Sequence, residues 1–388
     1  MSVPSVLIAA TVPVHLRAFH LPWVRRLRER GCNVVGIADQ ISEMPECVSA
    51  FTQVIDVPFS RNPLQFARAS KSENAVSEIL ASGGFDLVHV HTPVASFVTR
   101  KAANPFRKAG LKTIYTAHGF HFHDRGKLHR NLIFRILEKF AGRWTDYLIV
   151  HNRSDEEDAQ RMRIVPKERI IYHPGVGIDL NKYSRESVPP AEIARIRNEL
   201  KIPDGHHIVT MVSEFIPRKR HADVIKAFGL LHRPDIHLIL VGEGVLLHEV
   251  RTSAAALSLS KNIHFAGYRS DIPALITAAN CTILASLHEG LPRSVMESLS
   301  LEVPVIGSDV RGTRDLLAAG GGLTYPLGDI KSLASLITSA VDDREKWRQM
   351  GKVGRRSIAP YNLQNILELH EDLYRQASPA RFSKVLGK

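Results

Sequence analysis

The sequence predicts an α/β protein built from two doubly wound, Rossmann-like domains. Three observations support this prediction: short apolar runs alternate with amphipathic helical patterns, the alternation stops once near the middle of the chain, and it then starts again. Near-continuous Val, Ile and Leu runs separated by helices are typical of a parallel sheet that is covered on both faces. The 388 residues are also sufficient for two domains of about 150–200 residues each.

The first half of the chain contains one complete set of alternating elements. The predicted strands are 5–11, 33–39, 53–58, 86–92, 112–118 and 146–152, and the helical patterns between them are 19–30, 74–82, 93–108 and 128–144. Gly, Pro and other turn-forming residues then dominate 169–190, and we place the interdomain linker at about 172–190. The first domain is therefore expected to cover residues 1–172.

The second half repeats this architecture. The predicted strands are 207–213, 237–243, 262–268, 281–286, 303–308 and 322–326, and helical patterns lie at 222–232, from 245, and at 272–279, 294–301, 330–342 and 344–356. We expect a second domain over residues 190–360. A last helix, 362–376, has Leu363, Ile366, Leu367 and Leu373 near one face, and the residues from Ser378 onward are expected to be disordered.

Charge and composition limit the partners and the compartment. The net charge is +12, and residues 1–172 carry 24 Lys and Arg against 16 Asp and Glu, which is +8 of that excess. A basic half indicates an anionic partner, such as a membrane surface, a diphosphate or a nucleic acid, unless the charge only solubilises the surface. Three cysteines without a CxxC pattern indicate a reducing, cytosolic compartment.

The amino terminus is expected to be a first strand. It has a short apolar run but no basic segment before it, which argues against a signal peptide. Nowhere does an apolar run approach 18 residues, so we expect no membrane-spanning helix. Neither half has G-x-G-x-x-G after its first strand, and the chain has no G-x-x-x-x-G-K-[ST]. These absences argue against an NAD or FAD enzyme and against a P-loop ATPase.

The stretch 286–315 carries the clearest chemical pattern. A predicted strand ends just before Glu289 and Gly290, and a predicted helix carrying Glu297 follows. The turn between a strand's carboxyl end and a helix start favours phosphate binding, and nearby carboxylates can hold sugar hydroxyls. For Glu297 there is an alternative, because Ser294-x-x-Glu297 is also a capping box that would only stabilise the helix start.

The same stretch, SLHEGLPRSVMESLSLEVPVIGSDVRGTRDLL, resembles the signature of the retaining family 4 glycosyltransferases, which has two glutamates at this spacing. The resemblance covers nearly the whole chain and includes AGYRSDIPALITAANCTILAS, VSEFIPRKRHADVIKAF, VHVHTPVASFVTRKAA and KTIYTAHGFHFHDRG. The amino-terminal half is similar to the subgroup that builds exopolysaccharide, capsule or O-antigen repeats on a lipid carrier. The resemblance implies the GT-B fold, in which two Rossmann-like domains face a central cleft and the last helix, here 361–378, crosses back to the first domain.

The resemblance also implies roles for the two glutamates. Glu289 would contact the donor sugar and Glu297 would hold the nucleoside ribose. Backbone groups at the helix start, from Gly290, Leu291, Pro292 and Ser294, would bind the donor diphosphate. Tyr268 is a further donor-binding candidate.

Positive charge beside the leaving diphosphate is expected from the segment after residue 213. The Lys of the family pattern matches Lys219, which we assign as catalytic, but Glu214 stands where the family usually has an Arg. Arg218 could supply the second charge, and Arg220 is a third candidate. The alternative is that these basic residues form only a solvated helix start.

His118 is the third catalytic candidate, because the resembled family has a histidine that faces the reacting sugar at this position. A neutral or charged imidazole can donate to a sugar hydroxyl there. A metal site of His118, His121 and His123 with His89 and His91 is an alternative, but cationic side chains at the diphosphate make a divalent ion unnecessary, and His89 and His91 fit simple core packing. We therefore expect no metal. The first turn lacks the Gly-Gly pair of many relatives, and His15 is an acceptor-side candidate.

Basic amphipathic patterns in the first half favour an anionic membrane surface as a partner. The first pattern contains Trp23, Arg25, Arg26, Arg28 and Arg30, and the second contains Lys127, Arg130, Leu132, Ile133, Phe134, Arg135, Leu137, Lys139, Arg143 and Trp144. Nucleic acid is a weaker alternative because no nucleic-acid-binding module accompanies the charge. We expect a protein of the cytoplasm that binds peripherally to the inner face of the plasma membrane.

Together these features predict a retaining, metal-independent glycosyltransferase without a cofactor. It would move a sugar from a nucleotide-sugar, with a UDP-sugar as the favoured donor, to a polyprenyl-diphosphate-linked saccharide in surface polysaccharide biosynthesis. Two other functions fit the same fold: a nucleotide-sugar epimerase or a phosphorylase, and a non-catalytic protein that binds sugar nucleotides. Solvent proton exchange at a sugar carbon without acceptor would favour the epimerase, and tight donor binding without transfer would favour the binding protein.

Overall fold

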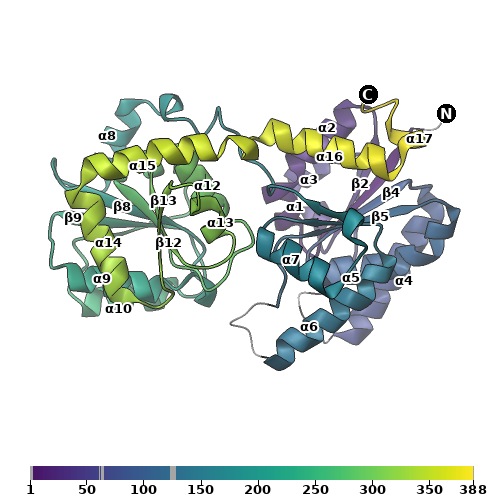
Figure 1. Ribbon diagram of the computed structural model, residues 1–388, viewed down its shortest axis with the longest axis horizontal. Coiled ribbons are helices and arrows are strands. Elements are labelled where there is room, and N and C mark those ends of the chain that lie inside the picture. The colour runs from purple at the N-terminus through teal and green to yellow at the C-terminus, as the bar shows by residue number, and fades with distance from the viewer. Residues whose placement is uncertain (1–2, 61, 63–64, 123–127, 388) are drawn as a thin grey trace. The chain divides into compact units, whose positions relative to one another are not determined.

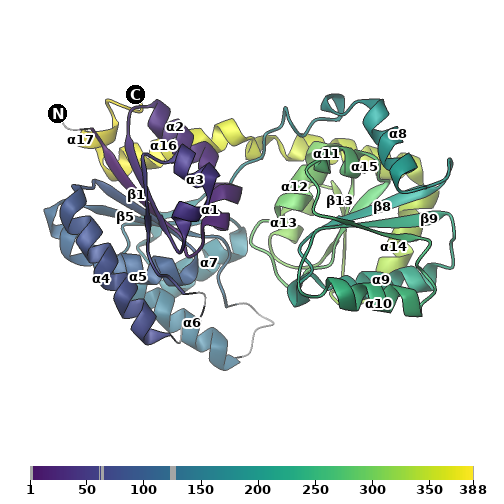
Figure 2. The same cartoon turned by 180° about the vertical axis from the view of Figure 1, so that it is seen from behind.

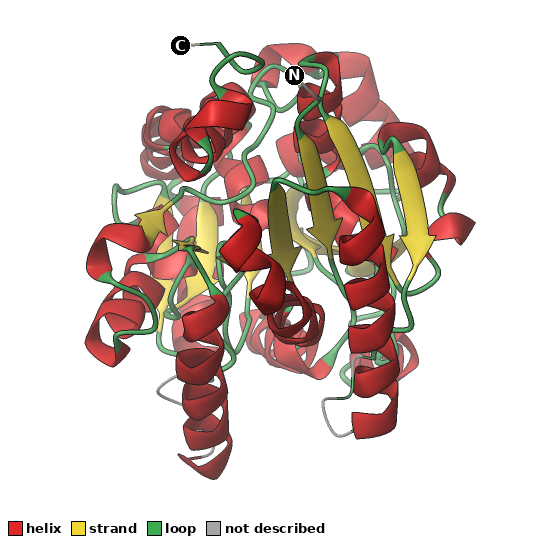
Figure 3. Cartoon of the chain, turned by 90° about the vertical axis from the view of Figure 1, so that its right-hand side faces the viewer, coloured by secondary structure: helices red, strands yellow, loops and turns green. Residues whose placement is uncertain are grey.

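The computed structural model describes residues 3–60, 62, 65–122 and 128–387, and these form two compact units (Figure 1). Unit 1 comprises Met1–Val176 and Gln364–Lys388, and unit 2 comprises Gly177–Leu363. Each unit has one parallel β-sheet with helices on both sides of the strands (Figure 3). The predicted α/β class with two Rossmann-like units is confirmed.

The sheet of unit 1 has the strand order β3-β2-β1-β4-β5-β6-β7. Its strands are β1 (Ser5–Ala9), β2 (Asn33–Ala38), β3 (Gln53–Asp56), β4 (Leu87–His91), β5 (Lys112–Ala117), β6 (Tyr147–Val150) and β7 (Ile170–Tyr172). The helices are α1 (Pro13–Phe19), α2 (Leu21–Glu29), α3 (Pro45–Ala50), α4 (Phe66–Gly83), α5 (Pro93–Ala103), α6 (Leu128–Ala141), α7 (Arg153–Met162), α16 (Leu363–Ala377) and α17 (Pro379–Phe382). All residues of β1 and β4 are buried, as expected of central strands covered on both faces.

The sheet of unit 2 has the strand order β10-β9-β8-β11-β12-β13. Its strands are β8 (His207–Val212), β9 (Ile236–Val241), β10 (Ile263–Gly267), β11 (Cys281–Leu284), β12 (Val305–Ser308) and β13 (Gly322–Tyr325). The helices are α8 (Pro190–Glu199), α9 (His221–Leu231), α10 (Leu247–Ala256), α11 (Ile272–Thr277), α12 (Arg293–Ser300), α13 (Thr313–Leu317), α14 (Ile330–Asp342) and α15 (Arg344–Ser357). Val209 and Met211 pack into one apolar layer and Ile208 into the other, which is the alternation that a strand imposes.

The helix α16 packs on unit 1 beside α2, as Figures 1 and 2 show. The indole Nε1 of Trp23 donates to the hydroxyl of Tyr374 over 3.3 Å. Glu371 is buried and accepts from Nε of Arg26 over 2.8 Å and from Nε of Arg30 over 3.2 Å. An apolar face and a buried carboxylate with two arginines therefore hold this helix on unit 1.

Several details differ from the sequence-based expectations. The predicted helix 19–30 corresponds to α2, and the residues before it form a separate helix, α1, which ends next to His20. The predicted elements did not include the strand β7 or the helices α1, α3, α7, α8 and α13. The expectation of disorder from Ser378 onward is wrong, because Phe382 is fully buried in the short helix α17.

In the part of the chain that the structure describes, no helix combines the length and the apolar character that crossing a bilayer requires.

The strand order reverses at one point in each sheet, between β1 and β4 in unit 1 and between β8 and β11 in unit 2. In open α/β sheets, ligands bind outside the carboxyl ends of the strands at such switch points. We therefore expect ligand-binding residues in the loops that follow β1, β4, β8 and β11.

Candidate functional site

The switch point of unit 2 holds a buried carboxylate between two cations. Glu289 follows β11, and Arg218 and Lys219 follow β8. Both cations donate to the same carboxylate oxygen, Oε1 of Glu289, over 2.8 Å from Nη1 of Arg218 and 2.6 Å from Nζ of Lys219. Arg218 also donates to the backbone carbonyl of His288 over 3.0 Å, so its guanidinium is fixed to the loop after β11.

The charges in this cluster depend on one another. Burial raises the pKa of Glu289, but the adjacent Lys219 and Arg218 outweigh burial and hold it below the ordinary value. Burial lowers the pKa of Lys219, and Glu289 partly restores it. The side chain of Glu289 is only 9% exposed and that of Lys219 only 13%, so a ligand that reaches them meets fixed charges with little competing water.

The other residues of this basic segment take different positions. Glu214, at the position where the family usually has an arginine, is exposed. Arg220 forms an ion pair with Asp223 in the first turn of α9. Of the three basic residues in this segment, Arg218 and Lys219 are therefore the two in contact with Glu289.

Glu297 lies in α12 and is not part of a capping box. The helix begins at Arg293 with Pro292 as its N-cap, so Ser294 is already inside the helix and the capping alternative is wrong. Glu297 instead accepts from Nε of Arg293 over 2.9 Å and is hydrogen-bonded to Tyr183. Burial raises the pKa of Glu297, and Arg293 and Tyr183 only partly offset this.

The loop before α12 is shaped by a close backbone contact. Gly312 has φ +73°, and a Cβ at this position would lie 2.0 Å from the carbonyl oxygen of Gly290. Only glycine fits there, because the loops after β11 and β12 touch through their backbones. Leu291 and Pro292 continue from this contact into the start of α12, where the first N–H groups have no partner within the helix.

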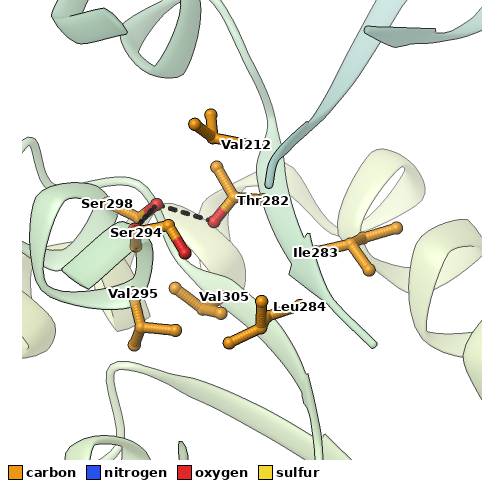
Figure 4. A pocket seen from close by; sticks show the side chains of 8 residues that line it. All are labelled: Val212, Thr282, Ile283, Leu284, Ser294, Val295, Ser298 and Val305. Carbon is orange, nitrogen blue, oxygen red and sulfur yellow. Dashed lines mark hydrogen bonds between the residues drawn. The ribbon is translucent and has the colours of Figure 1, made fainter. Parts of the chain in front are cut away.

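The side chain of Ser294 lines a small cavity behind α12 (Figure 4). The cavity lies among residues of β8, β11, β12 and α12: Val212, Thr282, Ile283, Leu284, Ser294, Val295, Ser298 and Val305. Thr282 donates to the hydroxyl of Ser298 over 2.8 Å, and Ser298 donates to the carbonyl of Ser294 over 2.8 Å. With a volume of about 10 Å³ the cavity has room for at most about one water, so it is too small to hold a diphosphate.

Tyr268 follows β10 and its side chain is 75% exposed. The contacts described for unit 2 do not join it to the cluster around Glu289. The structure therefore brings Arg218, Lys219 and Glu289 together, and places Glu297 in a separate contact with Arg293 and Tyr183.

The switch point of unit 1 holds a group of histidines at the carboxyl ends of β1, β4 and β5. His118 follows β5, and its Nε2 lies 3.3 Å from Nδ1 of His91, the last residue of β4. The ring of His15 packs edge-on against that of His118, with centroids 4.6 Å apart. His20, between α1 and α2, contacts His15, with 3.3 Å between their Nε2 atoms.

Burial keeps these imidazoles neutral. It lowers the pKa of His15 to about 4, with a contribution from His151. It also holds the pKa of His118 and of His91 well below the ordinary value, and neighbouring histidines add to the effect. At neutral pH, His118 can therefore donate one hydrogen bond and accept another without carrying charge.

Not all of the histidines that the sequence suggested as an alternative metal site come together among the described residues. His121 is exposed, and His123 lies outside the described residues. His89 is buried and bonded to Tyr374 (2.9 Å) and Thr116 (2.7 Å), which agrees with the core-packing alternative. Among the described residues, the group that could hold a metal is instead His15, His20, His91 and His118.

Sequence reasoning missed Tyr183 and His20. Tyr183 lies in the segment that was assigned as linker, and nothing in its local sequence indicates a contact with a residue of α12. His20 lies inside what looked like one continuous helix. Each becomes a candidate only through contacts that the fold creates.

The comparisons with known proteins agree with this arrangement. The family described as "Glycosyl transferases group 1" matches residues 192–357, and "Glycosyltransferase Family 4" matches residues 23–182. EpsD of Bacillus subtilis (strain 168), named as a glycosyltransferase, is 30% identical over 373 residues, which cover 95% of this chain and 96% of EpsD. The UDP-Gal:alpha-D-GlcNAc-diphosphoundecaprenol alpha-1,3-galactosyltransferase of Escherichia coli is 26% identical over 326 residues, 82% of each chain.

Among solved structures, Anabaena HepE in complex with UDP and glucose superposes with a TM-score of 0.79 at 18% identity, covering 96% of this chain and 100% of that one. This likeness identifies the fold as GT-B. The two family matches lie one in each half of the chain, and the relationship to EpsD spans nearly its full length. The chain therefore belongs to glycosyltransferase family 4 and is a glycosyltransferase of the GT-B fold, of the kind that works in polysaccharide biosynthesis.

Proposed function

We propose that this enzyme is a retaining, metal-independent transferase that moves a hexose or N-acetylhexosamine from a UDP-sugar to a polyprenyl-diphosphate-linked saccharide. The observation that carries the proposal is the contact of Lys219 and Arg218 with one oxygen of Glu289 at the switch point of unit 2. A nucleotide-sugar needs fixed positive charge for its diphosphate and an acceptor for its sugar hydroxyls. In this cluster the cations Lys219 and Arg218 lie within hydrogen-bond distance of the acceptor Glu289.

Departure of the nucleotide breaks the bond between the sugar's anomeric carbon and a diphosphate oxygen. Negative charge then accumulates on the diphosphate, and preorganised cations lower the energy of that state. In the proposal, Lys219 and Arg218 provide this charge together with the first N–H groups of α12. Because both cations are side chains of the protein, the departure step needs no divalent ion.

Glu289 would bind hydroxyls of the donor sugar. Its cationic neighbours keep its pKa low, so it remains an ionised acceptor. Glu297, with Tyr183 and Arg293, would hold the nucleoside ribose. In unit 1, His118 would donate to the reacting sugar and His15 would lie on the acceptor side.

Retention of the anomeric configuration is proposed from the family resemblance. In a front-face reaction the acceptor hydroxyl attacks from the side on which the nucleotide departs. A diphosphate oxygen takes the hydroxyl proton as the new glycosidic bond forms. No covalent intermediate with a protein carboxylate is then required.

The relatives support the donor and acceptor classes. The name of the Escherichia coli relative specifies a UDP-sugar donor and a diphosphoundecaprenol-linked acceptor, and HepE was solved with UDP and glucose. Both features fit a cluster that presents cations to a diphosphate. We therefore propose UDP as the nucleotide and a lipid-linked saccharide as the acceptor.

We also propose that unit 1 binds the anionic inner face of the plasma membrane through α6. Six large apolar side chains of this helix are exposed: Leu128, Leu132, Ile133, Ile136, Leu137 and Phe140. Lys139, in the last turn of α6, and Arg143, just after this helix, also line a pocket of about 890 Å³. The other basic residues of its lining are Arg107, Arg161, Arg163, Lys167 and Arg169.

An apolar helix face beside a basic pocket suits a bilayer with anionic headgroups, because the face can enter the acyl boundary while the cations meet phosphate. Arg107 and Arg161 are paired with Asp146 and Asp158, and the remaining basic residues of the lining add to the positive potential. Lys127, part of the predicted basic pattern, lies outside the described residues.

The direct test incubates the protein with a panel of nucleotide-sugars and a polyprenyl-diphosphate-linked saccharide, with and without EDTA. The proposal expects a glycosylated lipid product by mass spectrometry from a UDP-sugar, in a yield that EDTA does not lower, with the donor's anomeric configuration retained by NMR. Donor binding without product would indicate a non-catalytic protein. Exchange of a sugar proton with solvent in the absence of acceptor would indicate an epimerase.

A further inference from the structure

Four imidazoles converge in unit 1 at the carboxyl edge of its sheet. They come from four segments: His15 from α1, His20 from the junction of α1 and α2, His91 from the end of β4, and His118 from the residue after β5. One nitrogen of each ring lies within 4.8 Å of one nitrogen of each of the other three. Four potential ligand atoms of the same type thus lie close together.

Two of the nitrogen pairs already have the spacing of a tetrahedral metal site. Nε2 of His15 lies 3.3 Å from Nε2 of His20, and Nδ1 of His91 lies 3.3 Å from Nε2 of His118. With metal–nitrogen bonds of about 2.0–2.1 Å, the edge of a tetrahedron is about 3.3–3.4 Å. The nitrogen–nitrogen distance in each of these two pairs therefore matches the edge length of such a tetrahedron.

The chemistry of the four rings also fits a metal. Their pKa values are depressed by burial, so the rings are neutral, which is the form that binds a metal ion. His20 and His91 are buried, whereas His15 and His118 are partly exposed and leave a side for entry.

We propose that His15, His20, His91 and His118 form a binding site for a divalent transition-metal ion of the Zn²⁺ type. Imidazole ligands select zinc and its neighbours, whereas Mg²⁺ and Ca²⁺ prefer oxygen ligands. The site goes beyond the proposed transfer reaction and lies in a different unit from the cluster that would hold the diphosphate. It also differs from the sequence-based expectation of no metal, because that expectation did not foresee His15 and His20 beside His91 and His118.

A bound ion would use the same nitrogens that the sugar would use. If the proposed function is correct, a filled site withholds His15 and His118 from the substrates, and Zn²⁺ inhibits transfer while EDTA restores it. This consequence rests on the proposed function, but the binding of the metal does not. Metal content therefore tests the site even if the reaction is a different one.

The experiment uses the untagged full-length protein, so that no added histidines bind metal. The protein is loaded with Zn²⁺, dialysed, and its metal content and thermal midpoint are measured, with Mg²⁺ as the comparison ion. We expect about one Zn²⁺ per chain and a midpoint raised by Zn²⁺ but not by Mg²⁺. His20→Gln and His15→Gln should each weaken Zn²⁺ binding by at least about tenfold, since even residues that only orient metal ligands contribute this much.

The control is His264→Gln, which removes a histidine from the hydrogen-bonded set His206, His237 and His264 of unit 2 and should leave Zn²⁺ binding unchanged. If a variant does not fold, Co²⁺ loading of the wild type still tests the site. Tetrahedral Co²⁺ absorbs visible light far more strongly than octahedral Co²⁺, so we expect a strong visible spectrum. Wild-type protein that retains no Zn²⁺, or variants that retain as much as wild type, would overturn the proposal. A weak octahedral Co²⁺ spectrum would overturn it as well.

Discussion

At the residue scale, the two glutamates of the family motif differ in electrostatic environment although both are buried. Glu289 contacts two cations and its pKa is held low, whereas Glu297 contacts one arginine and a tyrosine and its pKa is raised by burial. The number of neighbouring cations decides which effect dominates. Glu289 is thus suited to remain an anion beside a diphosphate, and Glu297 to accept from a neutral hydroxyl.

The raised pKa of Glu297 has a defined effect on stability. A carboxyl whose folded-state pKa lies above its ordinary value of 4.5 stabilises the folded state at low pH, and this contribution is lost as the pH rises through the folded-state pKa. The stability of wild type relative to Glu297→Gln should therefore fall as the pH increases from about 4.5 and then level off. Urea unfolding midpoints over a pH series would measure it, and a relative stability that grows with pH would contradict the assignment.

Gly312 tests the backbone contact that shapes the donor loop. In Gly312→Ala the new Cβ would meet the carbonyl of Gly290, so we expect a loss of about 2–3 kcal/mol in unfolding free energy. Gly205→Ala is the matched control, because Gly205 also has a positive φ but has open space around it. Chemical denaturation of both variants separates the clash from backbone strain, and equal losses would show that the contact with Gly290 does not matter.

At the scale of single elements, the loops after β8 and β11 and the helix α6 carry the two halves of the proposed function. The strands β8 and β11 are parallel neighbours, so their carboxyl ends lie together. Arg218 and Lys219 can therefore donate to Oε1 of Glu289, which lies about 70 positions later in the chain. In α6 the sequence provides more apolar side chains than unit 1 covers. An exposed apolar face is costly in water and is typical of an interaction surface.

Membrane binding through α6 is tested with vesicles. Ile133→Asp and Ile136→Asp place a charge on the exposed face, and each should reduce binding to anionic vesicles about tenfold or more, because burial of each isoleucine contributes about 1.5–3 kcal/mol. Leu230→Asp, on an exposed position of α9 in unit 2, is the matched control. Flotation with anionic and zwitterionic vesicles gives the comparison, and equal binding of all three variants would exclude α6 as the contact.

At the scale of the whole molecule, the alternation of apolar runs and helical patterns was enough to predict every strand of both sheets except β7. Elements without a strong local pattern were missed: β7 has only three residues, and α8 lies next to a Pro-rich turn. The family motif pointed to Glu289 and Lys219 because both lie in short stretches that match the family pattern, and Arg218 became a candidate because it is adjacent to Lys219. Tyr183 and the histidine group could not be predicted, because only the folded sheet brings such distant segments together.

The central claim is that Lys219 and Glu289 serve transfer of a sugar from a nucleotide donor. The most direct measurement is the steady-state rate of transfer to a lipid-linked saccharide by Lys219→Ala and Glu289→Gln. Their controls are Lys226→Ala and Glu249→Gln, at exposed positions of the same unit. Thermal midpoints of all four variants would confirm that they are folded. We predict that kcat falls by about 10²–10³-fold in the first two, as for loss of a preorganised charge contact, and is unchanged in the controls. Rates within twofold of wild type for folded Lys219→Ala and Glu289→Gln would contradict the account.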